Sequence, residues 1–184
     1  MRILPALAAA MVLCVPALAE AEPPTLRLGI EVHGSFLTNQ VDRSLLNVTF
    51  GGAVRIGYRA DGATWGGYVV FEQNAWLATE LARQVVPGVR NFGIGVERIW
   101  ADGIVRTSLS VGLSTLAFDT ELHQKNTTGI FFDLRPAALR WAITDAVAFE
   151  LTPFHLAVVA PVLDEPTLVN VEYRTTLGFE FGLR

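Results

Sequence analysis

Residues 169–184 read VNVEYRTTLGFEFGLR, and they separate into two faces when every second residue is taken together. The odd-numbered positions, all but one apolar or aromatic, are Val169, Val171, Tyr173, Thr175, Leu177, Phe179, Phe181 and Leu183. The even-numbered positions are polar or glycine: Asn170, Glu172, Arg174, Thr176, Gly178, Glu180, Gly182 and Arg184. Because successive side chains of a β-strand point to opposite sides of a sheet, the pattern predicts a strand with one apolar and one charged face. Its length, against an average strand of about five or six residues, requires a special environment, which the rest of the chain indicates to be a membrane.

The same two-residue period recurs along the rest of the chain. It predicts eight strands, at residues 25–36, 48–60, 65–76, 89–100, 104–118, 128–142, 146–158 and 169–184. Each is long enough to cross a bilayer as a tilted strand, which takes about 9 to 11 residues. The chain is therefore predicted to be all-β.

The connections between these strands alternate between short and long. Tight turns are predicted at residues 60–64, 101–103 and 144–145, and the first two contain the Asp-Gly pair that favours hairpins. Longer connections are predicted at residues 37–47, 77–88, 119–127 and 159–168. In an up-and-down sheet all the long loops lie at one end, and the tight turns lie with both termini at the other, as in outer-membrane barrels. We therefore predict an eight-stranded antiparallel up-and-down transmembrane β-barrel.

One connection has two interpretations. Leu77, Leu81 and Val85 are spaced four apart, which favours a short helix or an irregular cap over residues 77–86. The sequence Val-Pro-Gly-Val at residues 86–89 instead suits a turn that closes a hairpin projecting beyond the membrane.

The beginning of the chain predicts export. Arg2 precedes an apolar stretch and then a run of small residues, which is the layout of a signal peptide over residues 1–19, with cleavage after Ala19 or, as the alternative, after Ala21. Pro5 in the short apolar stretch argues against a retained membrane anchor. The single cysteine lies inside this segment, so no disulfide is expected in the barrel domain, residues 20–184. The expected location is the outer membrane of a Gram-negative bacterium.

The net charge of the chain limits the classes of partner that it can bind. The net charge of −4 argues against nucleic acid and gives no polybasic surface for anionic lipid. Lys125 is the only lysine, and arginine makes up the rest of the 14 basic residues. Arginines held in fixed carboxylate pairs would explain this composition, as would a GC-rich codon usage.

The charged face of the strands is predicted to line a narrow barrel. An eight-stranded barrel has just enough interior for side chains, and glycine, serine and threonine between paired charges would fill it. The predicted interior charge network is Arg27, Glu31, Arg55, Arg59, Glu72, Glu97, Arg106, Asp133, Arg135, Glu150, Glu172, Arg174 and Glu180.

Alternation alone does not distinguish an outward from an inward apolar face, because a soluble lipocalin-like barrel also alternates. Aromatic residues beside the tight turns favour the membrane, where they form a girdle at the lipid interface. The predicted girdle is Tyr58, Trp65, Tyr68, Trp100 and Trp141. Three arginines that fall on the apolar face lie near strand ends, where the cost of a charge is small: Arg90, Arg98 and Arg140.

These patterns resemble the small eight-stranded outer-membrane barrels, of the OmpA membrane-domain and OmpX type, over the entire mature chain. The resemblance implies that Tyr173, Phe179 and Phe181 in the last strand act as the signal for the outer-membrane barrel assembly machinery, although three residues follow the last aromatic. Outer-membrane lipid is the expected partner, the protein is expected to be monomeric or loosely associated, and no cofactor is expected.

The first predicted strand contains a candidate catalytic site. His33 and Ser35, with Glu31 on the same face, resemble the His-x-Ser arrangement of lipid A deacylases. The pair shares its face with Arg27, so a hydrogen-bonded pair near the barrel mouth is the preferred interpretation. His155 lies far from other histidines and shows no metal-ligand spacing, so no metal site and no catalytic residue are predicted.

The sequence therefore favours a non-enzymatic outer-membrane barrel with a structural or loop-presenting role and a charged, largely plugged interior. A soluble periplasmic lipocalin-like barrel that binds an apolar ligand is the alternative from another class. A narrow pore and a lipid-modifying barrel enzyme are the remaining alternatives.

Overall fold

The protein is described by a computed structural model, which covers residues 25–39, 46–60, 62–76, 88–117, 128–163 and 168–183. Its strands, with one short 3₁₀ segment, are β1 (Thr25–Asn39), β2 (Leu46–Arg59), β3 (Trp65–Trp76), β4 (Gly88–Trp100), η1 (Ala101–Gly103), β5 (Val105–Ala117), β6 (Thr128–Thr144), β7 (Val147–Val162) and β8 (Leu168–Leu183). The signal-peptide prediction and the two interpretations of residues 77–86 lie outside the described residues. Among those residues, no helix has the length and apolar character needed to cross a membrane.

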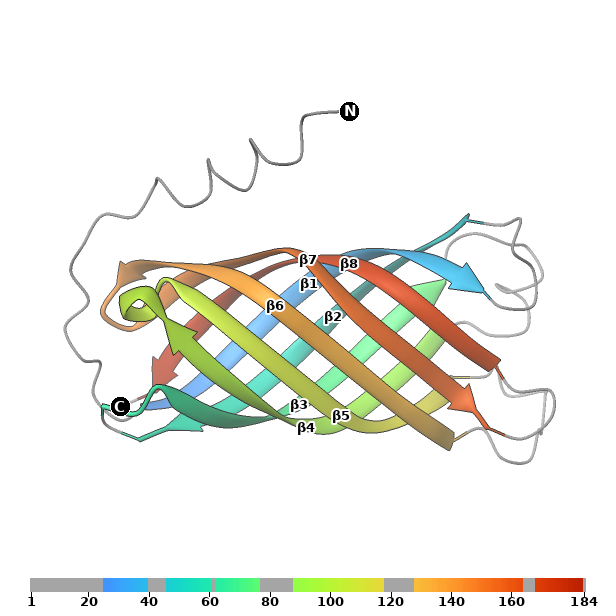
Figure 1. Ribbon diagram of the computed structural model, residues 1–184, viewed down its shortest axis with the longest axis horizontal. Helices are drawn as coiled ribbons and strands as arrows, with labels where there is room; N and C mark the ends of the chain where they lie inside the picture. The colour runs from blue at the N-terminus through green and yellow to red at the C-terminus, as the bar shows by residue number, and fades with distance from the viewer. Residues whose placement is uncertain are drawn as a thin grey trace.

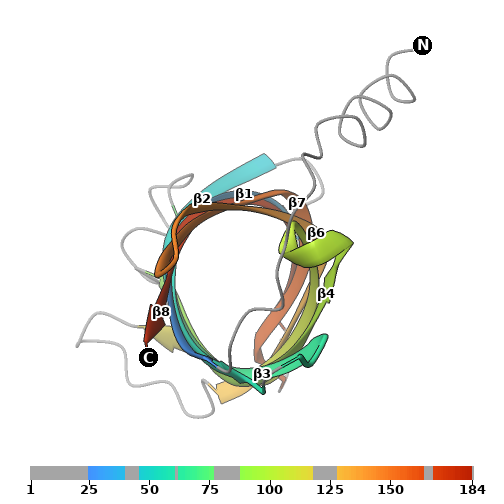
Figure 2. The same ribbon diagram turned by 90° about the vertical axis from the view of Figure 1, so that its left-hand side faces the viewer.

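The eight strands form one closed antiparallel barrel, in which each strand pairs with its neighbours in sequence. Closure is made by β1 and β8, whose register runs from Leu26 opposite Leu183 to Asn39 opposite Asn170. The strands are inclined to the barrel axis, and the three short turns lie at the same end as the start of β1 and the end of β8 (Figure 1). A view along the axis shows the ring closed on all sides (Figure 2). The predicted fold class is confirmed.

Strand boundaries differ from the sequence prediction mainly at the end opposite the short turns. β1 continues to Asn39 and β7 continues to Val162, although residues 37–47 and 159–168 were predicted as connections. The reason is that backbone pairing continues where the side-chain pattern weakens: Leu37 still lies opposite Asn47, and Val162 opposite Leu168. These parts of the predicted long connections are therefore strand.

Two of the short turns depend on glycine. Gly62 and Gly103 have φ angles of 66° and 93°, a backbone region that glycine adopts without the steric cost of a Cβ. Both belong to the Asp-Gly pairs that predicted tight turns.

The apolar face of the sheet points outward. In β8, Tyr173, Leu177 and Phe179 are 43%, 45% and 47% exposed, whereas Glu172 and Arg174 are 0% and 1% exposed. The other strands follow the same arrangement. A lipocalin-like barrel requires the reverse orientation, so that alternative is wrong.

Two prolines change which residues face inward. In β6, Asp133 and Arg135 point into the barrel, but after Pro136 the inward residues are Ala138 and Arg140. The pairing register between β5 and β6 shifts at the same level, where a two-residue step in β5, from Arg106 to Ser108, lies opposite a three-residue step in β6. Proline cannot donate a backbone hydrogen bond and is accommodated in sheets at such irregularities. Arg140 therefore lies in the interior, which corrects its predicted position on the lipid side.

A similar irregularity occurs in β7, where Thr152 and His155 both point inward on either side of Pro153. On the outer surface, threonine hydroxyls bind the carbonyl groups of both prolines. Thr175 Oγ1 donates to the Pro153 carbonyl at 2.8 Å, and Thr107 Oγ1 donates to that of Pro136 at 2.8 Å. The hydroxyl groups thereby replace hydrogen bonds that these carbonyls lose from the regular ladder.

Candidate functional site

The barrel interior holds nearly all the charge of the described strands. All thirteen side chains predicted for the interior network are buried, with exposures of 7% or less. Together with Arg140, the described part of the interior contains seven arginines and seven carboxylates: Arg27, Arg55, Arg59, Arg106, Arg135, Arg140 and Arg174, and Glu31, Glu72, Glu97, Asp133, Glu150, Glu172 and Glu180. Because a buried charge is costly unless it is paired and hydrogen-bonded, this equality indicates mutual compensation.

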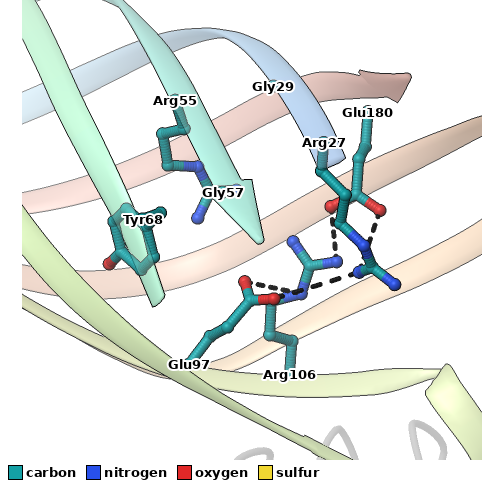
Figure 3. Close-up of a pocket in the computed structure, with 8 residues that line it drawn as sticks. All are labelled: Arg27, Gly29, Arg55, Gly57, Tyr68, Glu97, Arg106 and Glu180. Atoms are coloured by element: carbon teal, nitrogen blue, oxygen red, sulfur yellow. Dashed lines mark hydrogen bonds and ion pairs between the residues drawn. The ribbon is translucent and has the colours of Figure 1, made fainter. Parts of the chain in front are cut away.

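At the short-turn end, Glu180 pairs with three arginines, and Figure 3 shows two of them, Arg27 and Arg106. Its carboxylate accepts hydrogen bonds from Arg106 Nη2 at 2.6 Å, Arg140 Nε at 3.1 Å and Arg27 Nη1 at 3.3 Å. The inward turn of Arg140 after Pro136 is what allows it to join. Arg106 also donates through Nη1 to Glu150 at 2.8 Å, which connects this group to the middle of the barrel.

In the middle of the barrel, two carboxylates each bridge two arginines. Glu150 accepts from Arg55 Nη2 at 2.8 Å as well as from Arg106. Glu31 is paired with Arg55 and accepts from Arg135 Nη1 at 2.8 Å. The short-turn end and the middle therefore form one connected network.

Toward the long-loop end, the main contact is a planar ion pair between Arg174 and Glu72. Arg174 donates to both oxygens of Glu72 at 2.8 Å, and its Nε donates to Glu172 at 2.7 Å. Glu72 Oε1 also accepts from the side-chain amides of Asn74 at 2.6 Å and Asn91 at 2.7 Å. Bidentate pairing of guanidinium with carboxylate restricts both position and orientation, so this group locks β3, β4 and β8 together.

His33 and Ser35 do not form the arrangement of a deacylase. Both point into the barrel and are 1% and 2% exposed. His33 Nε2 lies 2.5 Å from Asn74 Oδ1, whereas Ser35 contacts Thr49 and donates to Glu172 at 3.3 Å. The two side chains thus have separate partners and act as hydrogen-bonding parts of the lining.

A second histidine has a more organised environment that the sequence pattern did not reveal. His155 Nδ1 lies 2.7 Å from Asp133 Oδ1, and its Nε2 lies 2.7 Å from Thr176 Oγ1. Carboxylate, imidazole and hydroxyl in this order resemble an activated nucleophile, but His155 and Thr176 are 0% and 2% exposed. Their burial gives a substrate no access, so the three groups serve to connect β6, β7 and β8. The signal for His155 in the sequence was Pro153, which moves it to the inner face.

Tyr68 also lies inside, which corrects its placement in the aromatic girdle. The side chain is 8% exposed, and Arg55 Cζ lies 5.4 Å from its ring centroid. Its even number places it on the same face of β3 as Glu72, and the ring fits because position 95 is glycine: a Cβ there would lie 2.3 Å from Tyr68 Cζ. The remaining girdle residues, Tyr58, Trp65, Trp100 and Trp141, are 58%, 57%, 43% and 43% exposed.

A small cavity lies among these side chains. A cavity of about 20 Å³ lies at the short-turn end, between Arg27, Arg55, Tyr68, Glu97 and Arg106, among others (Figure 3). A cavity needs roughly 10–15 Å³ to hold one water molecule, so this one has room for about one. Within the described residues, no group of histidine, cysteine and acidic side chains could hold a metal ion.

Solved structures with a similar fold support the architecture. Neisserial surface protein A matches with a TM-score of 0.59 and 12% identity, covering 88% of this chain and 100% of that one. The barrel has the fold of the small eight-stranded outer-membrane proteins. Ail, the attachment invasion locus protein of Yersinia pestis, solved in complex with the heparin analogue sucrose octasulfate, matches with a TM-score of 0.51 and 11% identity, covering 86% and 99% of the two chains. No family model and no curated protein sequence matches.

The aromatic residues predicted as an assembly signal lie on the outer face of this barrel. Tyr173 and Phe179 are exposed and Phe181 is half-buried. Phe179 packs edge-on against Phe149 of β7, with ring centroids 5.7 Å apart. β8 continues past Phe181 to Leu183, so the last aromatic is inside the strand and not at its end.

Proposed function

We propose that this protein is a closed outer-membrane barrel with a structural role, which supports the envelope and presents the connections at its long-loop end to the exterior. The observation that carries the proposal is the combination of an apolar outer surface with an interior filled by paired charges. The first property fits a lipid environment, and the second fits a barrel whose lumen is filled by side chains.

The outer surface supports the membrane location. Large apolar side chains project from every strand, and examples from five of them are Ile30 (49% exposed), Ile56 (47%), Phe92 (58%), Leu113 (55%) and Leu177 (45%). Soluble monomers rarely expose contiguous apolar patches of more than a few hundred Å². A closed sheet satisfies its backbone hydrogen bonds internally, which is what a lipid environment demands.

The topology supports an orientation. Outer-membrane barrels place short turns in the periplasm and longer loops outside, and a signal peptide over residues 1–19 would deliver the chain to the periplasm. The barrel assembly machinery would then insert it, with the outward aromatic residues of β8 as the recognition element and outer-membrane lipid as the final partner. No interaction with nucleic acid and no stable oligomer is required for this role.

The packed interior favours a structural role over a pore. Seven carboxylates and seven arginines meet across the lumen, and the cavity at the short-turn end holds about 20 Å³. A hydrated ion would need a path of connected water past these ion pairs, and the paired side chains stand in its way. The interior is therefore proposed to act as a plug that joins the strands.

Cell fractionation and conductance test the two parts of this proposal. The mature protein should require detergent for extraction and should appear in the outer-membrane fraction; recovery as a detergent-free periplasmic monomer would contradict the membrane location. Reconstituted in planar bilayers at high salt, it should give no stepwise currents, with a general porin in the same bilayers as the positive control. Reproducible ohmic steps that scale with protein concentration would show that the barrel conducts.

A further inference from the structure

Arg98 is a charged residue on the outer face of the barrel, at the short-turn end of β4. It alternates with exposed Val96 and Trp100, so its side chain leaves the sheet on the apolar side. Its neighbours in the register are Trp65 of β3 and Thr107 of β5. Arg98 therefore belongs to the same level as the aromatic girdle.

Two tryptophans hold its guanidinium group. Arg98 Cζ lies 3.6 Å from the ring centroid of Trp100 and 5.3 Å from that of Trp65. Trp100 is itself fixed, because its Nε1 donates to Thr107 Oγ1 at 3.1 Å, and that hydroxyl donates to the Pro136 carbonyl at 2.8 Å. The contacts position the cation between two aromatic rings and do not neutralise its charge.

The pairing of Arg98 differs from that of the interior arginines. Arg174, Arg135 and Arg106 each contact at least two carboxylates. Arg98 has no carboxylate partner among the described residues, and its Nε is buried without a hydrogen-bond acceptor. A cation on the lipid face costs roughly 2–4 kcal/mol at mid-membrane and about 0–1 kcal/mol near the interface, so the position of Arg98 at the interface is tolerable although its Nε has no acceptor.

We propose that Arg98, with Trp65 and Trp100, binds the phosphate group of a phospholipid headgroup in the leaflet at the short-turn end. A guanidinium presents parallel N–H donors that match phosphate oxygens, and tryptophan is stable at the level of the headgroups. The proposal rests on the membrane location given above. It identifies a lipid contact on one side of the barrel, over β3, β4 and β5.

A second outward arginine provides the matched control. Arg90 lies on the same face of β4 but near its other end, and its Nε donates to Gln73 Oε1 at 2.8 Å. It therefore has the same charge and lies on the same face of the same strand, but no contact with a tryptophan is found for it among the described residues. Its substitution should not affect a phosphate site that depends on Trp65 and Trp100.

The test measures retention of phosphatidylglycerol by the folded mature barrel in detergent micelles, by native mass spectrometry. The wild type and Arg90→Gln should retain one lipid with the same affinity, and Arg98→Gln should bind about tenfold or more weakly, as expected when charge-assisted hydrogen bonds are lost. Trp100→Leu should weaken binding in the same direction. Folding of every variant is checked by its heat-modifiable mobility in electrophoresis.

Two further measurements distinguish a lipid phosphate from free phosphate, and distinguish failure of this proposal from failure of the proposed function. Inorganic phosphate at millimolar concentration should neither bind at this position nor displace the lipid; displacement would assign the site to the free anion and overturn the lipid proposal. Equal retention by the wild type and Arg98→Gln would also overturn it, while leaving the membrane barrel intact. Failure of the wild type to enter vesicles at all would instead contradict the proposed function.

Discussion

Substitution of Glu72 by glutamine should destabilise the barrel by about 3 kcal/mol. The carboxylate accepts two hydrogen bonds from Arg174 at 2.8 Å and one each from Asn74 and Asn91 at 2.6 and 2.7 Å. Glutamine has the same size but turns an N–H donor toward the guanidinium. Breaking a buried ion pair costs about 3–5 kcal/mol, and the lower value is expected because Glu172 still neutralises part of the charge at 2.7 Å.

The assay is reversible unfolding in urea with lipid vesicles, followed by tryptophan fluorescence. Arg90→Gln on the outer face is the control and should remain within about 0.5 kcal/mol of the wild type, as surface substitutions usually do. The double variant Glu72→Gln with Arg174→Gln should be more stable than the sum of the single effects predicts, by about 2 kcal/mol. A loss below 1 kcal/mol for Glu72→Gln, or strict additivity, would refute the idea that this pair stabilises the barrel.

Two other substitutions probe features of the strands. Thr175→Val removes the donor to the Pro153 carbonyl on the outer surface. It should lower the unfolding free energy by about 1–3 kcal/mol, the cost of a polar group left without its partner in a non-aqueous environment. An unchanged urea midpoint would show that the carbonyl needs no partner. Gly95→Ala places a Cβ against the ring of Tyr68 and should cost about 1–3 kcal/mol, whereas Gly29→Ala, whose Cβ would have ordinary contacts of 3.5 Å or more, should be tolerated. Thermal unfolding of the two alanine variants side by side would contradict this account if Gly29→Ala proved the more harmful.

The fold can be predicted from the sequence because the alternation of apolar and polar residues is a local property, and the strands of the barrel retain it. β3 occupies residues 65–76, as the pattern predicts. In β8 every even-numbered residue from Asn170 to Glu180 is buried, so the odd or even position of a residue (its parity) gives its face. Turn chemistry also depends on adjacent residues, so the glycine of each Asp-Gly pair identifies its turn. The strand ends are harder to predict, since pairing continues to Val162 without a matching side-chain pattern.

The sequence predicts which residues line the interior, but not which of them pair with one another. Parity is sufficient to place Glu31 and Glu150 inside, but their shared partner Arg55 depends on barrel closure and on the register of distant strands. Arg140 and His155 were missed for another reason: a proline bulge earlier in each strand reverses parity. Tyr68 lies near a turn, which predicts a place in the girdle, but it shares the inward face of β3 with Glu72.

The interior ion pairs have a consequence for how the barrel folds. Their partners are far apart in the chain: 153 residues separate Arg27 from Glu180, 104 separate Glu31 from Arg135, and 102 separate Glu72 from Arg174. A partly inserted sheet would hold one member of each pair in a low-dielectric medium without its counter-charge, which is strongly unfavourable. Contacts this distant in sequence form late and slow the process. Insertion and the meeting of β1 with β8 are therefore expected to occur as one cooperative event, with few long-lived open intermediates in the bilayer.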